Sequence, residues 1–274
     1  TRGSRTDLLN SPQLAMVGSR SPTANGRETA ERFARYFSVR GLTITSGLAT
    51  GIDGASHRGA LAGTAGTIAV LDSGPDQLYS RLLEDLATEI IADGLIVSEY
   101  PPGTSAHRCH LPQRNRIIAG MTTGTLVVEA ARRSSSLITA RLAGEYGREI
   151  FAIPGSIHNP MTKGCHRLIR DGAKLVEDAA DVLVELAPLL QIALDTDELC
   201  LQSTEENSHA LTNEPGYEKL LAALRFDPCS INVLAARTEL TAAELSSMLL
   251  LLEMEGLVEA LPGGRYSLAS KRAP

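Results

Sequence analysis

Leu14-Ala-Met-Val-Gly-Ser-Arg20 is the stretch of sequence that decides the fold. Its four consecutive apolar residues predict a strand buried on both faces, and the glycine after them predicts a tight turn. In the following segment, Arg27–Arg40, the residues Ala30, Phe33 and Phe37 recur at helical spacing. A buried strand, a turn and an amphipathic helix in this order predict the first unit of a parallel α/β sheet.

The same alternation continues to about residue 186. Short apolar runs predict further strands, at Leu42–Thr45, Thr67–Leu71, Leu95–Ser98, Thr125–Val128, Glu149–Ile153 and Ala173–Val176. The stretches between most of them predict helices, at Asp53–Ala62, Tyr79–Ala92, Leu137–Tyr146 and Cys165–Asp171. We therefore expect a parallel sheet covered by helices on both faces, with any ligand at the carboxyl ends of its strands.

A small C-terminal domain is predicted after a linker. Residues 187–215 contain Pro, Ser, Asn and Thr but no Lys or Arg, which indicates an acidic flexible linker. Residues 216–274 predict helices at Tyr217–Leu224, Ser230–Ala236 and Thr241–Glu255, followed by a hairpin over residues 257–268. Thr241 and Glu244 form a predicted capping box, and Gly256 is expected to end the third helix. Three helices and a hairpin predict a winged helix-turn-helix domain, so the expected domains are 1–186, 187–215 and 216–274.

The composition is that of an ordinary globular protein, with 43% hydrophobic and 21% charged residues among 274. No apolar run is long enough for a membrane span, and the first residues lack the apolar core of a secretory signal. The four cysteines lie far apart, which argues against a disulfide framework and a metal site. We expect a cytoplasmic protein with no membrane partner and no cofactor.

The formal net charge of −6 is unevenly distributed. Residues 185–215 carry seven acidic residues and no basic one, so most of the acidity belongs to this segment. The net charge of the whole chain is therefore no argument against an anionic partner of the first domain.

Three segments of the first domain have the residues of an anion site. Gly18-Ser19-Arg20 follows a strand, and backbone N–H groups at such a turn favour an anion, to which Arg20 adds a guanidinium. Ser46–Gly54 repeats this arrangement with more small residues. Arg114-Asn115-Arg116 is interpreted as a third turn, and Arg108 as an extension of its basic patch. None of the three is a dinucleotide fingerprint or a phosphate-binding P-loop.

Glu129 is the one acidic residue in a position typical of a catalytic residue, because it lies at the end of the predicted strand Thr125–Val128. Asp53 is interpreted instead as a first-turn residue that the helix dipole favours. His57 alone is interpreted as a packed histidine, and no Ser-His-Asp set or metal-ligand cluster is evident. We therefore expect no catalytic residue and no enzyme activity.

The third helix of the C-terminal domain contains no Lys or Arg and three Glu. A helix that reads a DNA groove needs cations to neutralise phosphates. We expect this domain to contact a protein or to be purely structural.

Seven motifs of the first domain occur in this order: Val17–Arg20, Ser46–Asp53, Ser98–Gly103, Pro112–Ile118, Val127–Ala130, Ser136–Ala140 and Ile153–Gly155. Together they resemble the DNA-processing protein A (DprA, or Smf) family. The resemblance implies a Rossmann-like α/β fold, a homodimer formed through that domain, and single-stranded DNA binding in a basic pocket. It also implies protection of incoming strands and loading of the RecA recombinase in natural transformation. An N-terminal helical domain often seen in the family is missing, so we expect a truncated chain.

Carried over motif by motif, the resemblance implies a set of pocket residues. They are Gly18, Ser19, Arg20, Ser46, Gly47, Leu48, Ala49, Arg114, Asn115 and Arg116, with Ser136 and Thr139 as weaker candidates. The sequence departs from the family at Leu111, usually Phe, at Ser135, usually Gly, and at Thr50, often Arg. These changes remove a cation and a possible stacking surface. With no Trp, four Phe and six Tyr, we expect binding dominated by phosphate contacts and weakly sequence-selective.

Two other functions remain open from sequence. Gly124-Thr-Leu-Val-Val-Glu129 loosely resembles a motif of the lysine-decarboxylase-like nucleotide hydrolases. Alternatively, the protein is a dimeric adaptor without DNA binding. A dehydrogenase is the class that the sequence favours least, because the dinucleotide fingerprint is absent.

Overall fold

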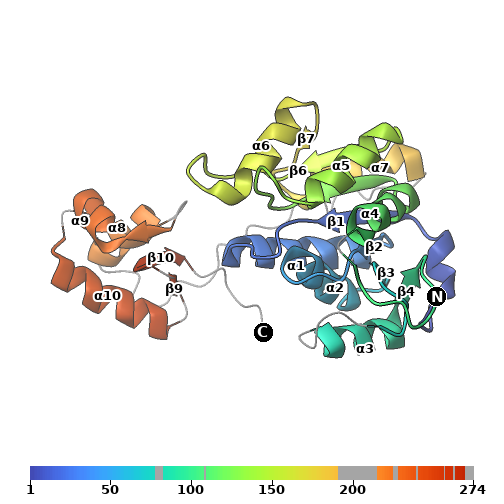
Figure 1. The fold of residues 1–274 in the computed structure, drawn as a ribbon. Helices are drawn as coiled ribbons and strands as arrows, with labels where there is room; N and C mark the ends of the chain where they lie inside the picture. The colour runs from blue at the N-terminus through green and yellow to red at the C-terminus, as the bar shows by residue number, and fades with distance from the viewer. Residues whose placement is uncertain are drawn as a thin grey trace. The chain divides into compact units, whose positions relative to one another are not determined.

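The computed structural model describes residues 1–77, 83–107, 109–190, 215–224, 228–238, 240–255, 257–261 and 263–268 (Figure 1). The chain divides into two compact units, Thr1–Leu199 and Cys200–Pro274, and each is described by itself. In these described ranges, no helix has the length and apolar character needed to cross a membrane.

The first unit is built on a parallel sheet of seven described strands, in the order β4-β3-β2-β1-β5-β6-β7. The strands are β1 (Gln13–Val17), β2 (Thr43–Ser46), β3 (Thr67–Leu71), β4 (Leu95–Ser98), β5 (Gly124–Val127), β6 (Glu149–Ala152) and β7 (Lys174–Leu175). All seven were predicted to within two residues at each end. The strand order runs outward on both sides from β1, so β1 and β5 flank the point where the topology reverses, and such points bind ligands in open α/β sheets. The Rossmann-like prediction is confirmed.

Helices cover both faces of this sheet (Figure 1). They are α1 (Ala24–Val39), α2 (Ile52–Leu61), α3 (Glu84–Asp93), α4 (His110–Met121), α5 (Ser136–Glu145), α6 (Lys163–Arg170) and α7 (Ala179–Leu190), with short 3-10 turns η1 (Thr6–Asn10) and η3 (Pro160–Thr162). Leu14 and Met16 of β1 pack with α1, α2 and α7 on one face. Ala15 and Val17 pack with α4, α5 and α6 on the other. This alternation explains why the strand is a continuous apolar run.

Three sequence predictions need correction. Arg114–Arg116 is not a turn, because it lies inside α4; Pro112 is the third residue of that helix, where a missing N–H breaks no helical hydrogen bond. Helix α1 begins at Ala24 rather than Arg27, because the Thr23 hydroxyl accepts a hydrogen bond from Gly26 N and caps the helix. Helix α7 continues to Leu190, into the predicted linker, and residues 191–214 lie outside the described residues. Arg108 and the first part of the helix predicted from Tyr79 also lie outside them.

The second unit has the helices and hairpin of a winged helix-turn-helix domain. Its elements are α8 (Pro215–Leu224), β8 (Cys229–Ser230), α9 (Ile231–Thr238), α10 (Ala242–Met254), β9 (Val258–Leu261) and β10 (Arg265–Leu268), with the strands in the order β8-β10-β9. The capping box is confirmed, since Thr241 Oγ1 accepts from Glu244 N and the Glu244 carboxylate accepts from Thr241 N. The short strand β8 was not predicted, and Gly256 lies outside the described residues.

Candidate functional site

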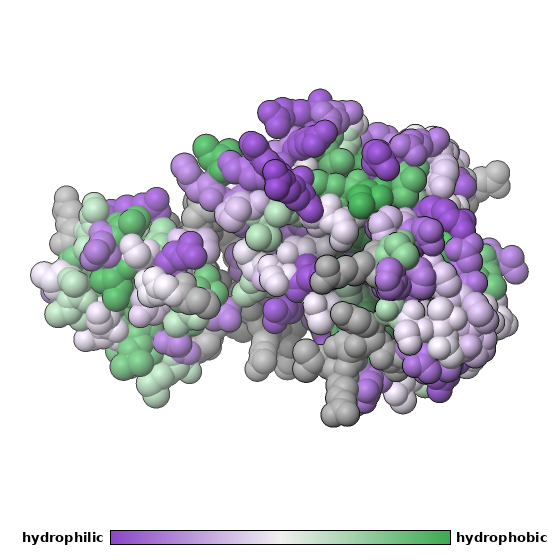
Figure 2. All heavy atoms as spheres, viewed as in Figure 1, coloured by the Kyte–Doolittle hydropathy of each residue, from purple (hydrophilic) through white to green (hydrophobic). Residues whose placement is uncertain are grey.

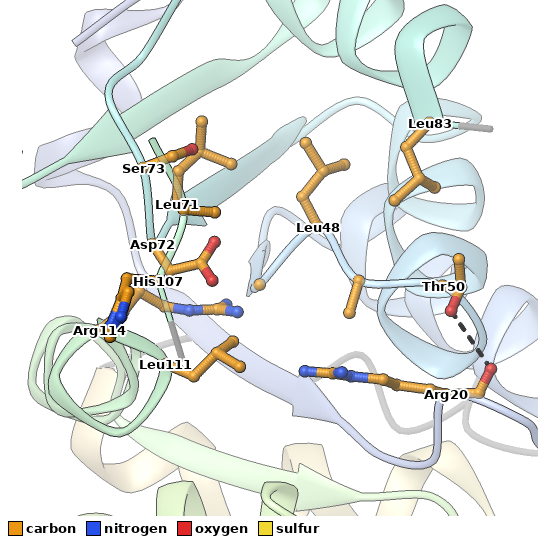
Figure 3. Close-up of a pocket in the computed structure, with 13 residues that line it drawn as sticks. Arg20, Leu48, Thr50, Leu71, Asp72, Ser73, Leu83, His107, Leu111 and Arg114 are labelled. Carbon is orange, nitrogen blue, oxygen red and sulfur yellow. Dashed lines mark hydrogen bonds between the residues drawn. The ribbon is translucent and has the colours of Figure 1, made fainter. Parts of the chain in front are cut away.

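A hollow of about 350 Å³ opens at the carboxyl ends of β1, β2 and β3 (Figure 3). This is where the sheet topology predicts a ligand. Its lining comes from the end of β3, the loops after the three strands, the residue before α3, and the start of α4 with the segment leading into it: Arg20, Gly47, Leu48, Ala49, Thr50, Leu71, Asp72, Ser73, Leu83, Ala106, His107, Leu111 and Arg114. Five of the predicted site residues are among them, namely Arg20, Gly47, Leu48, Ala49 and Arg114.

Arg114 is the buried cation of the hollow. Its side chain extends from the first half of α4 and is only 4% exposed. Burial lowers the pKa of Arg114, while the charges of Asp53 and Asp72 raise it. Its Nε is buried and has no hydrogen-bond partner among the described residues. An arginine held in this way has donors available at the wall of a hollow, which suits an anion or a carbonyl-rich ligand.

Asp53 is the counter-charge of Arg114, at the start of α2. It is 8% exposed, and burial raises the pKa of its carboxyl, an effect partly opposed by Arg114 and by backbone hydrogen bonds from Ala49 and Gly47. One turn later, His57 is fully buried and its Nδ1 lies 2.7 Å from Thr67 Oγ1. Burial lowers the pKa of His57 to about 3, so the ring is neutral. The prediction of a packed histidine is confirmed.

Arg20 approaches the hollow from the turn after β1. Its side chain is exposed, and Figure 3 shows its guanidinium pointing into the hollow beneath Leu48 and Thr50. The turn itself is held by backbone hydrogen bonds, from Ser19 N to Glu129 O at 2.7 Å and from Ile52 N to Ser19 O at 3.0 Å. The Arg20 guanidinium is therefore carried by a fixed turn but remains accessible to solvent anions.

The second glycine-rich turn adopts two unusual backbone conformations. Leu48 has a φ of +51°, and Gly51 has a φ of +84°. A β-carbon at Gly51 would lie 2.3 Å from Ser19 O, so the two turns touch here. Left-handed backbone at a non-glycine residue such as Leu48 is uncommon and concentrates at functional sites.

A second hollow, of about 30 Å³, shares Arg20, Ala49, Leu111 and Arg114 with the first. Four further predicted site residues line it: Gly18, Asn115, Ser136 and Thr139. Nine of the twelve predicted residues therefore surround two adjoining hollows.

The other three predicted residues lie elsewhere. The Ser46 hydroxyl is fully buried and donates to Met16 O at 2.6 Å. The Ser19 hydroxyl accepts from Ser21 N at 3.1 Å and so shapes its own turn. Arg116 is exposed on α4 and forms an ion pair with Glu99.

Glu129 has a structural partner. Its carboxylate accepts hydrogen bonds from Thr23 N at 2.9 Å and from Thr23 Oγ1 at 2.6 Å. A β-carbon at Gly26 would lie 2.4 Å from the carboxyl carbon, so the helix start packs directly on it. The negative charge stabilises the amino end of α1, which favours a structural role over a catalytic one.

Sequence reasoning missed the half of the hollow that follows β3. Asp72 and Ser73 come directly after this strand, and Ala106 and His107 precede α4. The position of Asp72 at the carboxyl end of a predicted strand was a usable signal. Ala106 and His107 lie in an irregular segment, whose path the residue pattern does not predict. No group of three His, Cys, Asp or Glu residues that could hold a metal occurs in the ranges that the structure describes.

The surface also carries cations away from the hollow. Figure 2 shows hydrophilic side chains gathered over α6, where Arg167 and Arg170 are exposed. Arg167 is paired with Asp171 four residues later. Exposed cations of this kind attract polyanions without fixing where they bind.

Family models and known proteins match both units of the chain. The family model described as DNA recombination-mediator protein A matches residues 2–187, and the model of the DprA winged helix domain matches residues 202–264. Protein Smf of Escherichia coli is 41% identical over 95% of this chain and 69% of its own length. DNA processing protein DprA of Streptococcus pneumoniae is 47% identical over 65% of this chain and 63% of its own length.

Two solved structures have a similar fold. The X-ray structure of DNA processing protein A from Streptococcus pneumoniae has a TM-score of 0.63 and 46% identity, over 67% of this chain and 64% of that one. A structure of the same protein from Helicobacter pylori, concerned with its single-stranded DNA binding mode, has a TM-score of 0.63 and 27% identity. That match covers 68% of this chain and 85% of the other.

Proposed function

The chain belongs to the DNA recombination-mediator protein A family, and we propose that it binds single-stranded DNA, without catalysis, at the two adjoining hollows. The single observation that carries the proposal is the placement of the Arg20 and Arg114 guanidiniums at one hollow, beside two glycine-rich turns (Figure 3). Cations and backbone N–H groups of this kind bind phosphate oxygens without regard to sequence.

The residues proposed to contact the strand have different roles, according to how exposed they are. The exposed Arg20 contacts phosphate directly, while Gly18, Gly47, Leu48, Ala49, Asn115, Ser136 and Thr139 shape the surface that the strand follows. Arg116 lies outside the lining of both hollows but on the same helix as Arg114, and it extends the strand's path once its ion pair with Glu99 opens. Ser19 and Ser46 act indirectly, by holding the two turns.

We further propose the physiological role that the family implies: a cytoplasmic homodimer that protects incoming strands and helps to load RecA during natural transformation. The similarity to DprA of Streptococcus pneumoniae supports this role. Sedimentation of the purified chain tests the dimer, and RecA-dependent strand exchange in the presence and absence of the protein tests the loading.

The winged helix domain is proposed to contact protein rather than DNA. On α10, Leu250, Leu251 and Met254 are exposed apolar side chains, and this helix carries no cation. A helix with these residues is unsuited to the phosphates that line a DNA groove.

Binding to a labelled oligothymidylate, compared with a duplex of equal length, tests the proposed function. Tighter binding of the single strand supports it. Equal binding of the two overturns the assignment to single-stranded DNA, and absent binding of both overturns the proposal and favours the adaptor. The hydrolase is disfavoured because Thr23 engages both carboxylate oxygens of Glu129.

A further inference from the structure

Helix α10 of the second unit is apolar on two sides (Figure 1). One side packs into the core of that unit, through Leu245, Leu249 and Leu252. The other side lies at the surface, where Leu250 is 59% exposed, Leu251 45% and Met254 79%. Adjacent large apolar side chains at a surface indicate a place where another molecule binds.

The first half of this exposed face is built from small residues. Ala243, Ser246 and Ser247 are exposed and lie on the same face as Leu250, at helical spacing from it. The two serine hydroxyls already donate within the helix, Ser246 Oγ to Ala242 O at 2.7 Å and Ser247 Oγ to Ala243 O at 3.2 Å. Covering them therefore leaves no hydroxyl donor without an acceptor. A second helix can approach closely at this half and pack on the large side chains of the other half.

Acidic residues border the exposed face. The helical rotation places Glu253 on one side of it and Glu255, which directly follows the helix, on the other. Both are exposed, and neither forms an ion pair with any residue in the described ranges. Helix α10 contains no Lys or Arg. The face is therefore an apolar stripe between negative charges that have no cation beside them on the helix.

These charges decide between the possible partners. Two copies of α10 packed face to face would bring carboxylates together with no cation between them, so a second copy of the chain is disfavoured. Nucleic acid and anionic lipid are disfavoured for the same reason. A protein helix with Lys or Arg beside its own apolar stripe matches both features, because apolar surface meets apolar surface and opposite charges meet at the edge.

Building on the proposed role of the winged helix domain in protein contact, we propose that the exposed face of α10 binds a basic amphipathic helix of a partner protein. Leu250, Leu251 and Met254 provide the apolar contact, and Glu253 and Glu255 select a basic helix. The flexible side chain of Met254 adapts to the side chains that pack on it. The apolar side chains supply most of the affinity, and the charges supply specificity.

Binding of labelled model peptides to the complete chain tests this proposal. The first peptide is a helix of leucine and lysine with one apolar face. The second replaces every lysine by glutamate, and the third has the composition of the first in an order that gives no apolar face. Fluorescence anisotropy should show the first peptide bound about ten-fold more tightly than the other two. Equal binding of the first and third peptides would reduce the interaction to net charge and overturn the proposal.

Leu250→Ser/Met254→Ser should weaken binding of the first peptide about ten-fold, because apolar area is lost from the contact. Val233→Ser is the control, since it changes an exposed apolar residue of α9 in the same domain, and it should bind like the wild type. Both changes are at exposed positions, and the wild-type comparison of the three peptides needs no variant to fold.

Glu253→Gln/Glu255→Gln should also weaken binding and make it less dependent on salt. Glu84→Gln/Glu89→Gln is the matched control, because it changes the net charge equally at exposed positions of α3. It should leave the affinity unchanged. An equal loss in both pairs would show that the charges beside α10 are not the ones that select the peptide.

The outcomes separate this inference from the DNA-binding function. Peptide binding that the α10 substitutions leave unchanged would overturn it, as would binding to neutral phosphatidylcholine vesicles instead of the peptide. Oligothymidylate binding should be the same in every variant. Failure of the wild type to bind the oligothymidylate would overturn the proposed DNA-binding function, and the peptide comparison would still decide the role of α10.

Discussion

The backbone of Gly47 lies against the guanidinium of Arg114, so closely that a β-carbon added to Gly47 would be 1.6 Å from Arg114 Nη1. The position of the Arg114 side chain therefore requires a residue without a side chain at position 47, although the two residues are far apart in sequence. The contact connects the turn after β2 to the helix that carries the buried cation.

Gly47→Ala is expected to displace Arg114 and to lower the affinity for single-stranded DNA about ten-fold or more, because one fixed guanidinium leaves the site. Fluorescence anisotropy with a labelled strand measures this. Gly120→Ala is the matched control, since its β-carbon would meet nothing closer than 3.8 Å and alanine favours a helix. An unchanged affinity in Gly47→Ala would show that the position of Arg114 does not matter for binding.

The burial of His57 predicts a loss of stability in acid. Its pKa is about 3 in the folded protein and near 6.5 when unfolded, so between these pH values the unfolded chain binds the extra proton. Stability is therefore lost as the pH falls through this window, with a slope approaching about 1.4 kcal/mol per pH unit. Urea unfolding followed by circular dichroism at several pH values measures the slope.

His57→Gln should remove this slope, because the amide can donate to Thr67 Oγ1 but does not titrate. The hydroxyl of Thr67 already donates to Ile44 O at 2.7 Å, so it needs a donor from residue 57. His158→Gln, at an exposed position, serves as the control and should keep the slope. A slope that persists in His57→Gln would place the titrating group elsewhere.

Glu129→Ala is expected to destabilise the protein by about 1–3 kcal/mol, because Thr23 N and its hydroxyl lose their acceptor at the start of α1. Glu145→Ala removes an exposed partner of Arg141 and should change stability by less than about 1 kcal/mol.

Incubation of the wild type with nucleoside monophosphates should release no free base. Base release that Glu129→Gln abolishes would restore the hydrolase interpretation.

The sequence predicted the elements whose signal is local and missed those that depend on tertiary packing. The runs at Leu14–Val17 and Thr67–Leu71 were recognised as strands because every side chain in them is buried. Residues 114–116 of helix α4 were predicted as a turn, because they are all polar or charged and follow closely after Pro112, so the sequence shows no helical pattern of apolar residues there. The burial of Arg114 was also hidden, because an arginine in a sequence is normally read as a surface residue.

The site residues show the same difference between a local sequence signal and a dependence on tertiary packing. The turns after β1 and β2 could be recognised in the sequence from their glycines and from Arg20, and residues of both turns line the hollow. Asp72 carries no such motif, and only the sheet brings it opposite Arg114. Ser46 resembles a ligand residue in sequence but is used to bind Met16 O within the sheet.

The most direct test of the central claim is the salt dependence of oligothymidylate binding for the wild type, Arg20→Ala, Arg116→Ala and Arg35→Ala. We predict a steep slope for the wild type and a slope reduced by about one in Arg20→Ala, because one phosphate contact is lost. Arg116→Ala should reduce the slope less, since Glu99 already pairs with it, and the exposed Arg35 on α1 should have no effect. A shallow wild-type slope, or an equal effect of Arg20→Ala and Arg35→Ala, would contradict the assignment of this hollow as the single-stranded DNA site.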